Sequence, residues 1–439
     1  MNPAREKSLD VLIAGTFAGR LIMSGDGELT FSYHPAYQGP DLSVGIPVSS
    51  DDYVGRRVLA WFDNLLPDNP QVRRGMAAEA GTSTGVFPLL ARFGLDLPGA
   101  IQVVAPDETH PSEREGGYVL LTDRAIGARL RRLADDDARH RARSWTTRDE
   151  HWSLGGMQAK LALRRHEGRW YECTGSGASN TIVKPGAAGL DNQALVEYAT
   201  MRLAAACGLP TASVSLENFD GAEAIAIERY DRFTSPESGQ VTRIHQEDLC
   251  QALATPSSKK YTTDGGPSSV QAMELMRGAE GNSTGRFVDA LLFNCLTAST
   301  DAHAKNYSLL HPAQGRYLLA PLYDVASAAP FMKKGKTYHL AMSIGGENRV
   351  GWLRKSSLER FEKIHGLDAG ALIDRTDEIA DAVVANIDAV LGELPHRDGI
   401  DRLTEVLRLR LLALCRATQR NIRVESTHFE AIDITRYNS

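Results

Sequence analysis

Residues Ser299–Leu310 read STDAHAKNYSLL, and this stretch sets a dense group of polar side chains between two apolar segments. In the segment before it, Phe287 and Leu291 belong to an apolar stripe with helical spacing, and the segment after it is typical of a strand. Within the stretch, Asp301 and Asn306 form the pattern D-x-x-x-x-N. A loop of this length can direct both side chains at one bound group from opposite sides. The stretch therefore predicts a functional loop between a helix and a strand.

The spacing of Asp301 and Asn306 is typical of the catalytic loop of protein kinases. There the aspartate accepts the proton of the attacking hydroxyl group, and the asparagine binds magnesium. The pair alone is weak evidence, because a D-x-x-x-x-N pattern occurs by chance in most proteins of this size. The fuller string Thr300-Asp301-x-His303-x-Lys305-Asn306 is much rarer. Its alternative interpretation is a helix cap followed by a solvated turn.

A second acidic residue follows in the segment RYLLAPLYDVAS, at residues 316–327. The pattern predicts a short hairpin and a strand that ends in Asp324, which is where a kinase places its second magnesium-binding aspartate. Mg²⁺ prefers oxygen ligands in an octahedron that phosphates and water complete, and Asn306 and Asp324 would supply two of these ligands. Taken alone, Asp324 is typical of an ordinary turn at the end of a strand.

Upstream, the segment TIVKP (Thr181–Pro185) places Lys184 at the end of a β-branched run. A lysine on an apolar strand is costly unless its ammonium group meets an anion, and the phosphates of ATP would serve. The alternative is an ammonium group that extends into solvent from the strand end. Glu197 lies at the edge of the apolar stripe of a predicted helix, where it is positioned to pair with Lys184. Its alternative interpretation is an ordinary exposed glutamate.

Two further segments have the composition of nucleotide-contacting turns. In SLGGMQAK (Ser153–Lys160), Gly155 and Gly156 would let backbone amides approach phosphates closely, although paired glycines also occur in ordinary turns. The segment AIERYD (Ala226–Asp231) ends a strand-rich region at the place of a hinge. Backbone groups there can hydrogen-bond adenine and Tyr230 can pack on its ring; the alternative is a strand followed by a charged turn.

The composition is that of an ordinary globular protein with more than one domain. The chain has 439 residues, of which 42% are hydrophobic and 24% are charged, so we expect two or three domains. No apolar run is long enough for a membrane helix. The five cysteines are scattered without a C-x-x-C pair, which predicts free thiols in a reducing cytoplasm and argues against a zinc or redox site. A net charge of −6 argues against a dedicated DNA-binding protein.

The order of the predicted elements indicates an α+β fold. Residues 1–150 are expected to form a β-rich N-terminal subdomain that ends in the charged stretch 123–148, which predicts a solvated helix. Residues 151–245 show strand patterns separated by hairpin turns. Residues 246–439 are mainly helical, with two long amphipathic helices after residue 367. A small β-rich lobe followed by a larger helical lobe is the order found in kinases.

Eight segments of the chain resemble, in the same order, motifs of the HipA-type kinases of bacterial toxin–antitoxin systems. WFDNLLPD (Trp61–Asp68) and GLDLPGAI (Gly94–Ile101) are similar to signatures of the N-terminal domain of that family. The segments that resemble motifs of its kinase domain are SLGGMQAK, IVKP, IERYDR, HQEDLCQ (His245–Gln251), TDAHAKN and LYDVAS. The resemblance covers nearly the whole chain, and so many segments in one order are far more specific than any one of them.

The resemblance implies an α+β fold with two lobes, similar to phosphoinositide and eukaryotic protein kinases, with a β-rich N-terminal subdomain. It implies that Asp301 is catalytic and that Asn306 and Asp324 bind magnesium. The residues that it implies for ATP are Gly155, Gly156, Met157, Gln158, Ala159, Lys160, Lys184, Glu228, Arg229, Tyr230, Gln246, His303, Ala304, Lys305, Asn306, Tyr323 and Asp324. Ser153 matches the serine that family members autophosphorylate, a modification that can push the loop 155–160 out of the site.

In function, the resemblance implies an ATP- and Mg²⁺-dependent serine/threonine protein kinase that is the toxin of a type II toxin–antitoxin system. The implied substrate is a translation protein such as an aminoacyl-tRNA synthetase, and the result is arrested growth and persistence. The implied partner is a small helix-turn-helix antitoxin similar to HipB, which represses the operon together with the toxin. Of a basic pair through which some relatives touch operator DNA, this chain keeps only Lys363. Operator DNA is therefore expected to be reached mainly through the antitoxin.

Two alternatives stay open at this point. A small-molecule or lipid kinase would share the D-x-x-x-x-N pattern, but the net charge of −6 argues against the basic membrane-facing surface that a lipid kinase needs. A non-catalytic co-repressor that only binds an antitoxin would not need the residues of phosphoryl transfer. Asp301, Asn306 and Asp324 are all present, which favours the kinase.

Overall fold

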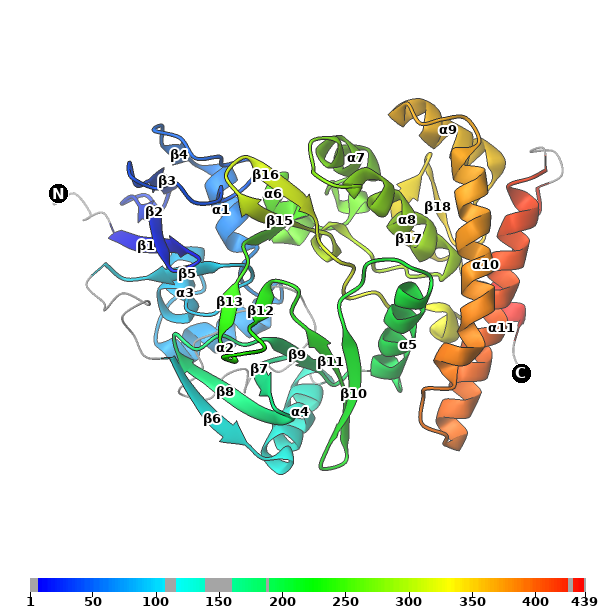
Figure 1. The fold of residues 1–439 in the computed structure, drawn as a ribbon, viewed down its shortest axis with the longest axis horizontal. Helices are drawn as coiled ribbons and strands as arrows, with labels where there is room; N and C mark the ends of the chain where they lie inside the picture. Colours follow the sequence, from blue (N-terminus) through cyan, green and yellow to red (C-terminus); the bar gives the residue numbers. More distant parts are fainter. Residues whose placement is uncertain (1–6, 107–115, 139–159, 187–188, 425–428, 438–439) are drawn as a thin grey trace. The chain divides into compact units, whose positions relative to one another are not determined.

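The computed structural model describes residues 7–106, 116–138, 160–186, 189–424 and 429–437 (Figure 1). Its contacts divide the chain into two compact units. The first unit is rich in strands and comprises Met1–Asp191, Ser215–Lys260 and Ser308–Ala320. The second unit is mainly helical and comprises Asn192–Val214, Tyr261–Tyr307 and Pro321–Ser439. The domain boundaries at residues 150 and 245 stay predictions, because each unit gathers segments from several parts of the chain.

The first unit begins with an antiparallel five-stranded sheet in the order β4-β3-β2-β1-β5 (Figure 1). Its strands are β1 (Lys7–Ile13), β2 (Thr16–Met23), β3 (Leu29–Tyr33), β4 (Tyr53–Val54) and β5 (Ile101–Val104). Alternate side chains of β3 are buried, which is the pattern of a strand with one face on a core. The helices between β4 and β5 are α1 (Arg56–Asp63), α2 (Pro70–Ala80) and α3 (Val86–Phe93). Phe31 of β3 and Trp61 and Phe62 of α1 are fully buried in one core.

A six-stranded sheet follows in the order β10-β11-β9-β7-β8-β6. Its strands are β6 (Gly116–Leu121), β7 (Leu161–His166), β8 (Arg169–Gly175), β9 (Thr181–Lys184), β10 (Val214–Phe219) and β11 (Ala222–Glu228). The charged stretch predicted as a solvated helix forms α4 (Asp123–Ala138), but it packs on this sheet. Its Ile126, Leu130 and Leu133 are buried in a core with Trp170 of β8. Their spacing of three and four residues gives α4 an apolar face despite its high charge.

Two smaller sheets complete the first unit. They contain β12 (Arg232–Thr234) with β13 (Val241–Arg243), and β14 (Gln246–Asp248) with β15 (Ser308–Ala313) and β16 (Arg316–Leu319). The carboxylate of Glu247 on β14 is buried and accepts hydrogen bonds from Trp61 Nε1 (3.1 Å) and His311 Nε2 (3.0 Å). Because a buried carboxylate is costly without such partners, these bonds hold α1 and β15 against β14.

The second unit is built from long helices and one hairpin (Figure 1). Its elements are α5 (Gln193–Ala206), α7 (Ser269–Arg277), α8 (Ser283–Leu296), α9 (Lys355–His365), α10 (Ala371–Leu391), α11 (Asp398–Asn421), β17 (His339–Ile344) and β18 (Glu347–Arg349), while the short α6 (Leu249–Ala252) belongs to the first unit. Helix α10 packs against α5, α8 and α11. Its buried Ile379, Val383 and Ile387 follow helical spacing. The prediction of two long amphipathic helices is confirmed by α10 and α11. Within the described part of the chain, no helix is both long and apolar enough to cross a membrane.

Candidate active site

Helix α8 and the loop after it carry the central polar residues in the second unit. The helix is buried along its apolar side, as predicted, and ends at Leu296. Ala298 then has a φ of 53°, which turns the chain out of the helix. Asp301 is exposed on the loop, whereas the following 3₁₀ turn Ala304–Asn306 is buried, as is His303 before it. The loop therefore presents one carboxylate to solvent on a support of buried neighbours.

The side chain of Asn306 joins the two segments that carry the predicted acidic residues. Its Nδ2 donates hydrogen bonds to the backbone oxygens of Asp301 (2.9 Å) and Asp324 (3.4 Å). Tyr323 adds a second link, because its hydroxyl donates a 2.6 Å hydrogen bond to the backbone oxygen of Lys305. The structure thus brings Asp301, Asn306 and Asp324 together within one unit.

The strand predicted to end in Asp324 ends earlier, and this part of the prediction is wrong. Strand β16 stops at Leu319, and Pro321 has no N–H group with which to extend a ladder. Leu322 forms an isolated bridge with Thr211 of the second unit instead. Asp324 has a φ of 57°, a left-handed conformation that aspartate adopts more readily than most residues. Asp324 therefore lies on a turn that follows the hairpin.

Asn306 and Asp324 provide the hard oxygen atoms that Mg²⁺ prefers. Because Nδ2 of Asn306 points at two backbone oxygens, Oδ1 is the atom of this amide that remains to face a metal. Among the described residues, no group of three or more His, Cys, Asp and Glu side chains is arranged to hold a metal ion. This chemistry fits a magnesium ion that is held by one carboxylate, one amide and the phosphates of a nucleotide.

Tyr261 is a site residue that the sequence analysis missed. Its hydroxyl donates a 2.5 Å hydrogen bond to Oδ1 of Asp301. Its ring also lies edge-on against the ring of His303, with 5.0 Å between the ring centroids. Tyr261 stands forty residues before Asp301 in a segment with no recognisable motif. No local pattern could have revealed a contact at that separation.

The residues predicted for ATP are divided between the units, with His303–Asn306, Tyr323 and Asp324 in the second unit and Lys184, Glu228, Tyr230 and Gln246 in the first. Lys184 ends β9, between β7 and β11, and is only 4% exposed. The alternative interpretation of Lys184 as a solvent-directed lysine is therefore wrong. At the end of β11, Glu228 is exposed. The hydroxyl of Tyr230 donates a 2.9 Å hydrogen bond to Oε1 of Gln246, which brings together two residues predicted from separate motifs.

The side chain of Arg229 is buried and forms ion pairs within the protein. It is 2% exposed and pairs with Asp231 through two hydrogen bonds of 2.9 and 2.8 Å. Arg232 and Asp96 extend this pair into a buried cluster of ionic groups. Burial by itself would raise the pKa of Asp231, but Arg229 and Arg232 overcome this effect and hold that pKa well below its usual range. The Arg229 side chain is thus committed to the fold, and contact with a nucleotide remains a prediction for its backbone alone.

Two predictions of the sequence analysis are not resolved by this geometry. Glu197 lies on α5 and is 1% exposed, so it is not an ordinary exposed glutamate. It belongs to the second unit and Lys184 to the first, and their pairing stays a prediction.

The predicted phosphate loop and its serine, Ser153 and Gly155–Ala159, lie outside the described residues. Lys160 is described and is partly buried immediately before β7.

Comparison with known proteins extends these local observations to the whole chain. The model of the HipA-like C-terminal domain matches residues 152–391, and the model of the HipA N-terminal domain matches residues 9–104. A protein of Sinorhizobium fredii named "Putative kinase Y4mE" is 30% identical over 405 residues, which cover 88% of this chain and 92% of that protein. The "Serine/threonine-protein kinase toxin HipA" of Shewanella oneidensis is 28% identical over 418 residues, which cover 91% of this chain and 92% of that toxin.

A solved structure is similar along nearly the same length. It is the complex of Shewanella oneidensis HipA with HipB and operator DNA, and the matching chain is 25% identical. The TM-score is 0.80, with 95% of this chain and 100% of the other chain covered. The predicted fold class, a protein-kinase-like α+β fold with two lobes and a β-rich N-terminal subdomain, is confirmed by this match.

Proposed function

This chain belongs to the HipA family, and from that premise we propose that it is an ATP- and Mg²⁺-dependent serine/threonine protein kinase, the toxin of a type II toxin–antitoxin system. The observation that carries the proposal is the side chain of Asn306, which ties the backbones of Asp301 and Asp324 together. A catalytic base and the residues for magnesium must meet at one phosphoryl group, and this contact supports the proposal because it holds the three residues close together. A protein that only bound an antitoxin would have no need of that arrangement.

Asp301 is proposed to accept the proton of a serine or threonine hydroxyl. As the proton leaves, the hydroxyl oxygen bonds to the γ-phosphorus of ATP, and the bond from that phosphorus to the bridging oxygen of ADP breaks. The exposed position of Asp301 suits this role, because a protein substrate must reach the carboxylate from outside. Tyr261 holds Oδ1 by a hydrogen bond, which leaves Oδ2 to face the substrate.

Asn306 and Asp324 would hold Mg²⁺, which neutralises charge on the β- and γ-phosphates when it is bound. Lys184 is proposed to place its ammonium group against the phosphates, and the support is the match of IVKP to the family motif and the buried position of Lys184 at the end of β9. Glu228, Tyr230 and Gln246 are proposed to contact the base. The residues proposed for the phosphates are Gly155, Gly156, Met157, Gln158, Ala159, Lys160, His303, Ala304 and Lys305.

Ser153 is proposed as a site of autophosphorylation that switches the kinase off. A phosphoserine adds about −1.5 to −2 charge at neutral pH, and this charge beside a triphosphate would repel it. The cationic side chain closest in sequence to the glycine pair is Lys160, and it could offset part of the negative charge of the phosphoserine. The support for this role is the match of SLGGMQAK to the family motif.

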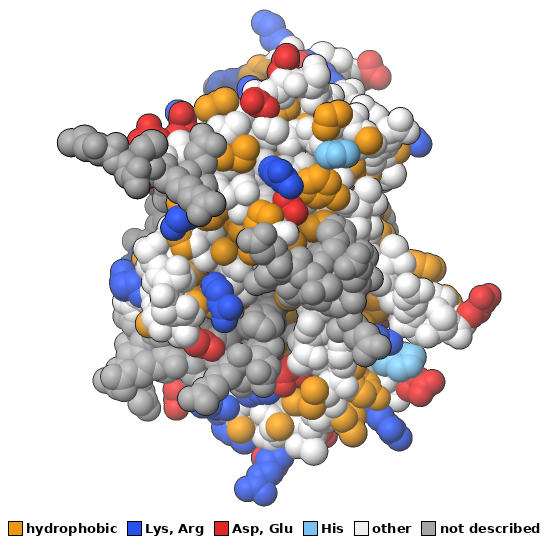
Figure 2. All heavy atoms as spheres, turned by 90° about the vertical axis from the view of Figure 1, so that its left-hand side faces the viewer, with side chains coloured by type: hydrophobic (Ala, Val, Ile, Leu, Met, Phe, Trp, Pro, Cys, Tyr) orange, Lys and Arg blue, Asp and Glu red, His pale blue; other side chains and the backbone are white. Residues whose placement is uncertain are grey.

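The proposed partner is a small helix-turn-helix antitoxin that resembles HipB, which accompanies HipA in the similar solved structure. Operator DNA would be reached mainly through that antitoxin. The net charge of −6 supports this, since proteins that bind DNA by phosphate contacts carry a basic excess. Figure 2 shows one face on which the described Lys, Arg, Asp and Glu side chains are interspersed. The proposed protein substrate is a translation component such as an aminoacyl-tRNA synthetase, whose phosphorylation would arrest growth and promote persistence.

The experiment that tests this proposal is phosphorylation of a cell lysate by the purified chain with γ-labelled ATP and Mg²⁺. We expect labelled serine or threonine on one or a few proteins, which mass spectrometry would identify. The matched control is Asp301→Asn, which keeps the shape of the side chain and removes the base. If the wild-type chain transferred no label to any protein, including itself, the proposal of a kinase would be wrong.

A further inference from the structure

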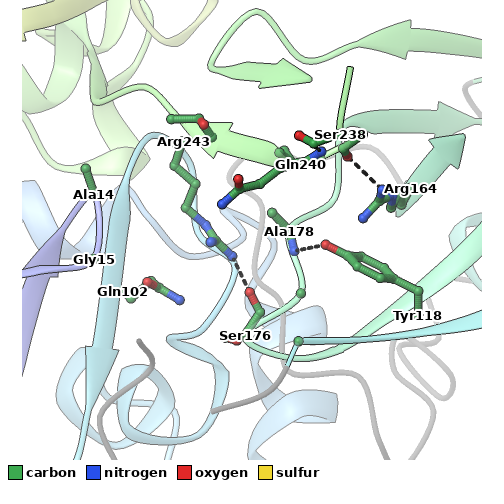
Figure 3. Close-up of a pocket in the computed structure, with 15 residues that line it drawn as sticks. Ala14, Gly15, Gln102, Tyr118, Arg164, Ser176, Ala178, Ser238, Gln240 and Arg243 are labelled. Atoms are coloured by element: carbon green, nitrogen blue, oxygen red, sulfur yellow. Dashed lines mark hydrogen bonds between the residues drawn. The ribbon is translucent and has the colours of Figure 1, made fainter. Parts of the chain in front are cut away.

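A polar cavity lies in the first unit, and none of the residues proposed for catalysis or for ATP lines it (Figure 3). Its volume is about 570 Å³, which is within the usual range of small-molecule sites. The turn after β1, strands β5, β6 and β7, and the hairpin of β12 and β13 contribute its walls. The cavity is therefore separate from the site described above and formed by other elements.

The lining of this cavity carries positive charge and hydrogen-bond donors. Its two charged side chains are Arg164 and Arg243, and no aspartate or glutamate is among the described residues that line it. Polar groups come from Gln102, Tyr118, Ser176, Ser238, Gln240 and Thr242. Figure 3 shows Arg243 with Gln102 on one side and Arg164 with Tyr118 on the other. A space with this lining is suited to an anion.

Arg164 is held in place without an acidic partner. Its guanidinium carbon lies 4.0 Å from the centre of the Tyr118 ring, and its Nη2 donates a 2.7 Å hydrogen bond to the backbone oxygen of Gly239. Both contacts orient the planar group, and neither neutralises its charge. Among the described residues, no carboxylate forms a salt bridge with Arg164. A preorganised guanidinium group with remaining N–H donors is a strong binder of oxyanions.

Arg243 belongs to the buried ionic cluster of Arg229, and it is the member that lines the cavity. The cluster contains three arginines and two aspartates, which leaves one positive charge in excess. The members are Arg229, Arg232, Arg243, Asp96 and Asp231. Arg243 forms a weaker ion pair with Asp96 than Arg232 does. Oδ1 of Asp96 lies 3.5 Å from Nη2 of Arg243 but 3.0 Å from Nη2 of Arg232. Nη2 of Arg243 also donates to the backbone oxygen of Ser176, whereas its buried Nε has no partner among the described residues. An uncompensated, partly buried charge is costly unless an anion meets it.

We propose that this cavity is a second ligand site, and that it binds a small phosphorylated molecule whose phosphate lies between Arg164 and Arg243. A phosphate monoester carries nearly two negative charges at neutral pH, which balance two guanidinium groups, whereas a single carboxylate would balance only one. The remaining volume and the amides of Gln102 and Gln240 would accept the rest of the molecule. The site would give this kinase a binding function that does not depend on phosphoryl transfer.

The test is calorimetric titration of the full chain with inorganic phosphate and with AMP, in buffer without magnesium. Arg164→Gln and Gln240→Glu are expected to weaken the binding of both probes at least tenfold. Gln240 is exposed, so a glutamate there adds negative charge to the lining without disturbing the core. Gln240→Lys is its matched partner and should bind at least as tightly as the wild type. Arg169→Gln, which removes an exposed arginine that does not line the cavity, should have no effect.

The outcomes separate this site from the proposed ATP site. Loss of binding in Arg164→Gln and Gln240→Glu, with binding retained in Lys184→Ala, would support the cavity even if the chain proved inactive as a kinase. Loss in Lys184→Ala alone would assign the bound phosphate to the ATP site and overturn the proposal. No measurable binding of either probe to the wild-type chain would overturn it as well. Thermal melting of each variant checks that lost binding does not reflect unfolding.

Discussion

The hydroxyl of Tyr261 donates a 2.5 Å hydrogen bond to the carboxylate of Asp301, and the ring of the same tyrosine lies edge-on to His303. One side chain therefore fixes the orientation of the proposed base and leaves one of its two oxygens for the substrate. Hydrogen bonds to charged groups contribute roughly 1.5–3 kcal/mol, although exposure of Asp301 to water favours the lower end. Tyr261 is thus proposed as a positioning residue.

Tyr261→Phe is expected to lower kcat about tenfold, since a loss of about 1.4 kcal/mol corresponds to one factor of ten in rate. The KM for ATP should stay close to that of the wild type, because the lost bond does not contact the nucleotide. Phenylalanine keeps the ring against His303, so the melting temperature should not change. Steady-state kinetics with a labelled protein substrate would measure both constants. An unchanged kcat would show that the bond has no role in orienting Asp301.

Asp301→Asn is expected to lower phosphoryl transfer by two to four orders of magnitude, the range that general-base catalysis contributes. The affinity for ATP should be kept, because Asp301 acts on the substrate hydroxyl. Single-turnover kinetics would report the chemical step, and calorimetry would report nucleotide binding. Wild-type autophosphorylation and toxicity in this variant would mean that another residue is the base.

Asp324→Ala is expected to weaken ATP binding in the presence of Mg²⁺ more strongly than in its absence. The reason is that the carboxylate is proposed to reach the nucleotide only through the metal. Calorimetric titrations with and without magnesium would give the two affinities. Ser153→Ala serves as the control, because it should leave metal-dependent binding intact. ATP binding that is equally tight without magnesium would contradict the proposed metal site.

Because of His245, the free energy of unfolding is expected to decrease as the pH falls below 6.5. Burial and the neighbouring His311 lower the pKa of His245 to about 3, whereas an unfolded histidine has a pKa of about 6.5. The unfolded chain therefore binds a proton that the folded chain excludes between these values. The stabilisation is fully present above pH 6.5 and declines by up to about 1.4 kcal/mol per pH unit as the pH falls.

Melting temperatures of the wild type and His245→Gln, measured from pH 7.5 to pH 5, would test this dependence. Glutamine can still donate to the backbone oxygen of Leu42, which accepts a 2.9 Å hydrogen bond from His245 Nε2. The variant should lose less stability on acidification than the wild type. His396→Gln is the matched control, because the His396 side chain is 83% exposed and should not affect the slope. If the melting temperatures of all three proteins changed equally with pH, His245 would not be the cause of the pH dependence.

Asp231→Ala is expected to destabilise the first unit by about 3–5 kcal/mol, because it leaves buried arginines without their partner. Asp231 accepts hydrogen bonds from Arg229 and Arg232 and from the backbone N–H of Gly99. Asp220→Ala is the control, since Asp220 and its partner Arg131 are about half exposed and such pairs contribute little. Thermal or urea unfolding followed by circular dichroism would compare the two. Equal stability of the two variants would show that the buried cluster does not support the fold.

Much of the candidate site was predictable, because the residues of each motif lie within one short segment of the chain. The stretch from Asp301 to Asn306 and the position of Asp324 are of this kind. The errors arose where a distant contact decided the structure. Strand β16 ends before Pro321, and Leu322 pairs with a segment more than a hundred residues earlier. The charged helix α4 is packed on a sheet because three widely spaced apolar residues outweigh its polar majority.

The sequence by itself determined the family, the fold class and the identities of the proposed catalytic residues. It could do so because motif order and residue chemistry are properties of the chain before it folds. Only the tertiary structure decided that Tyr261 contacts Asp301, that Arg229 shares a buried ionic cluster with Asp96, and that Arg164 and Arg243 line one cavity. Each of these facts joins residues that lie far apart in sequence. Packing of the whole chain selects such contacts, because charges and hydrogen-bonding groups must find partners wherever folding buries them.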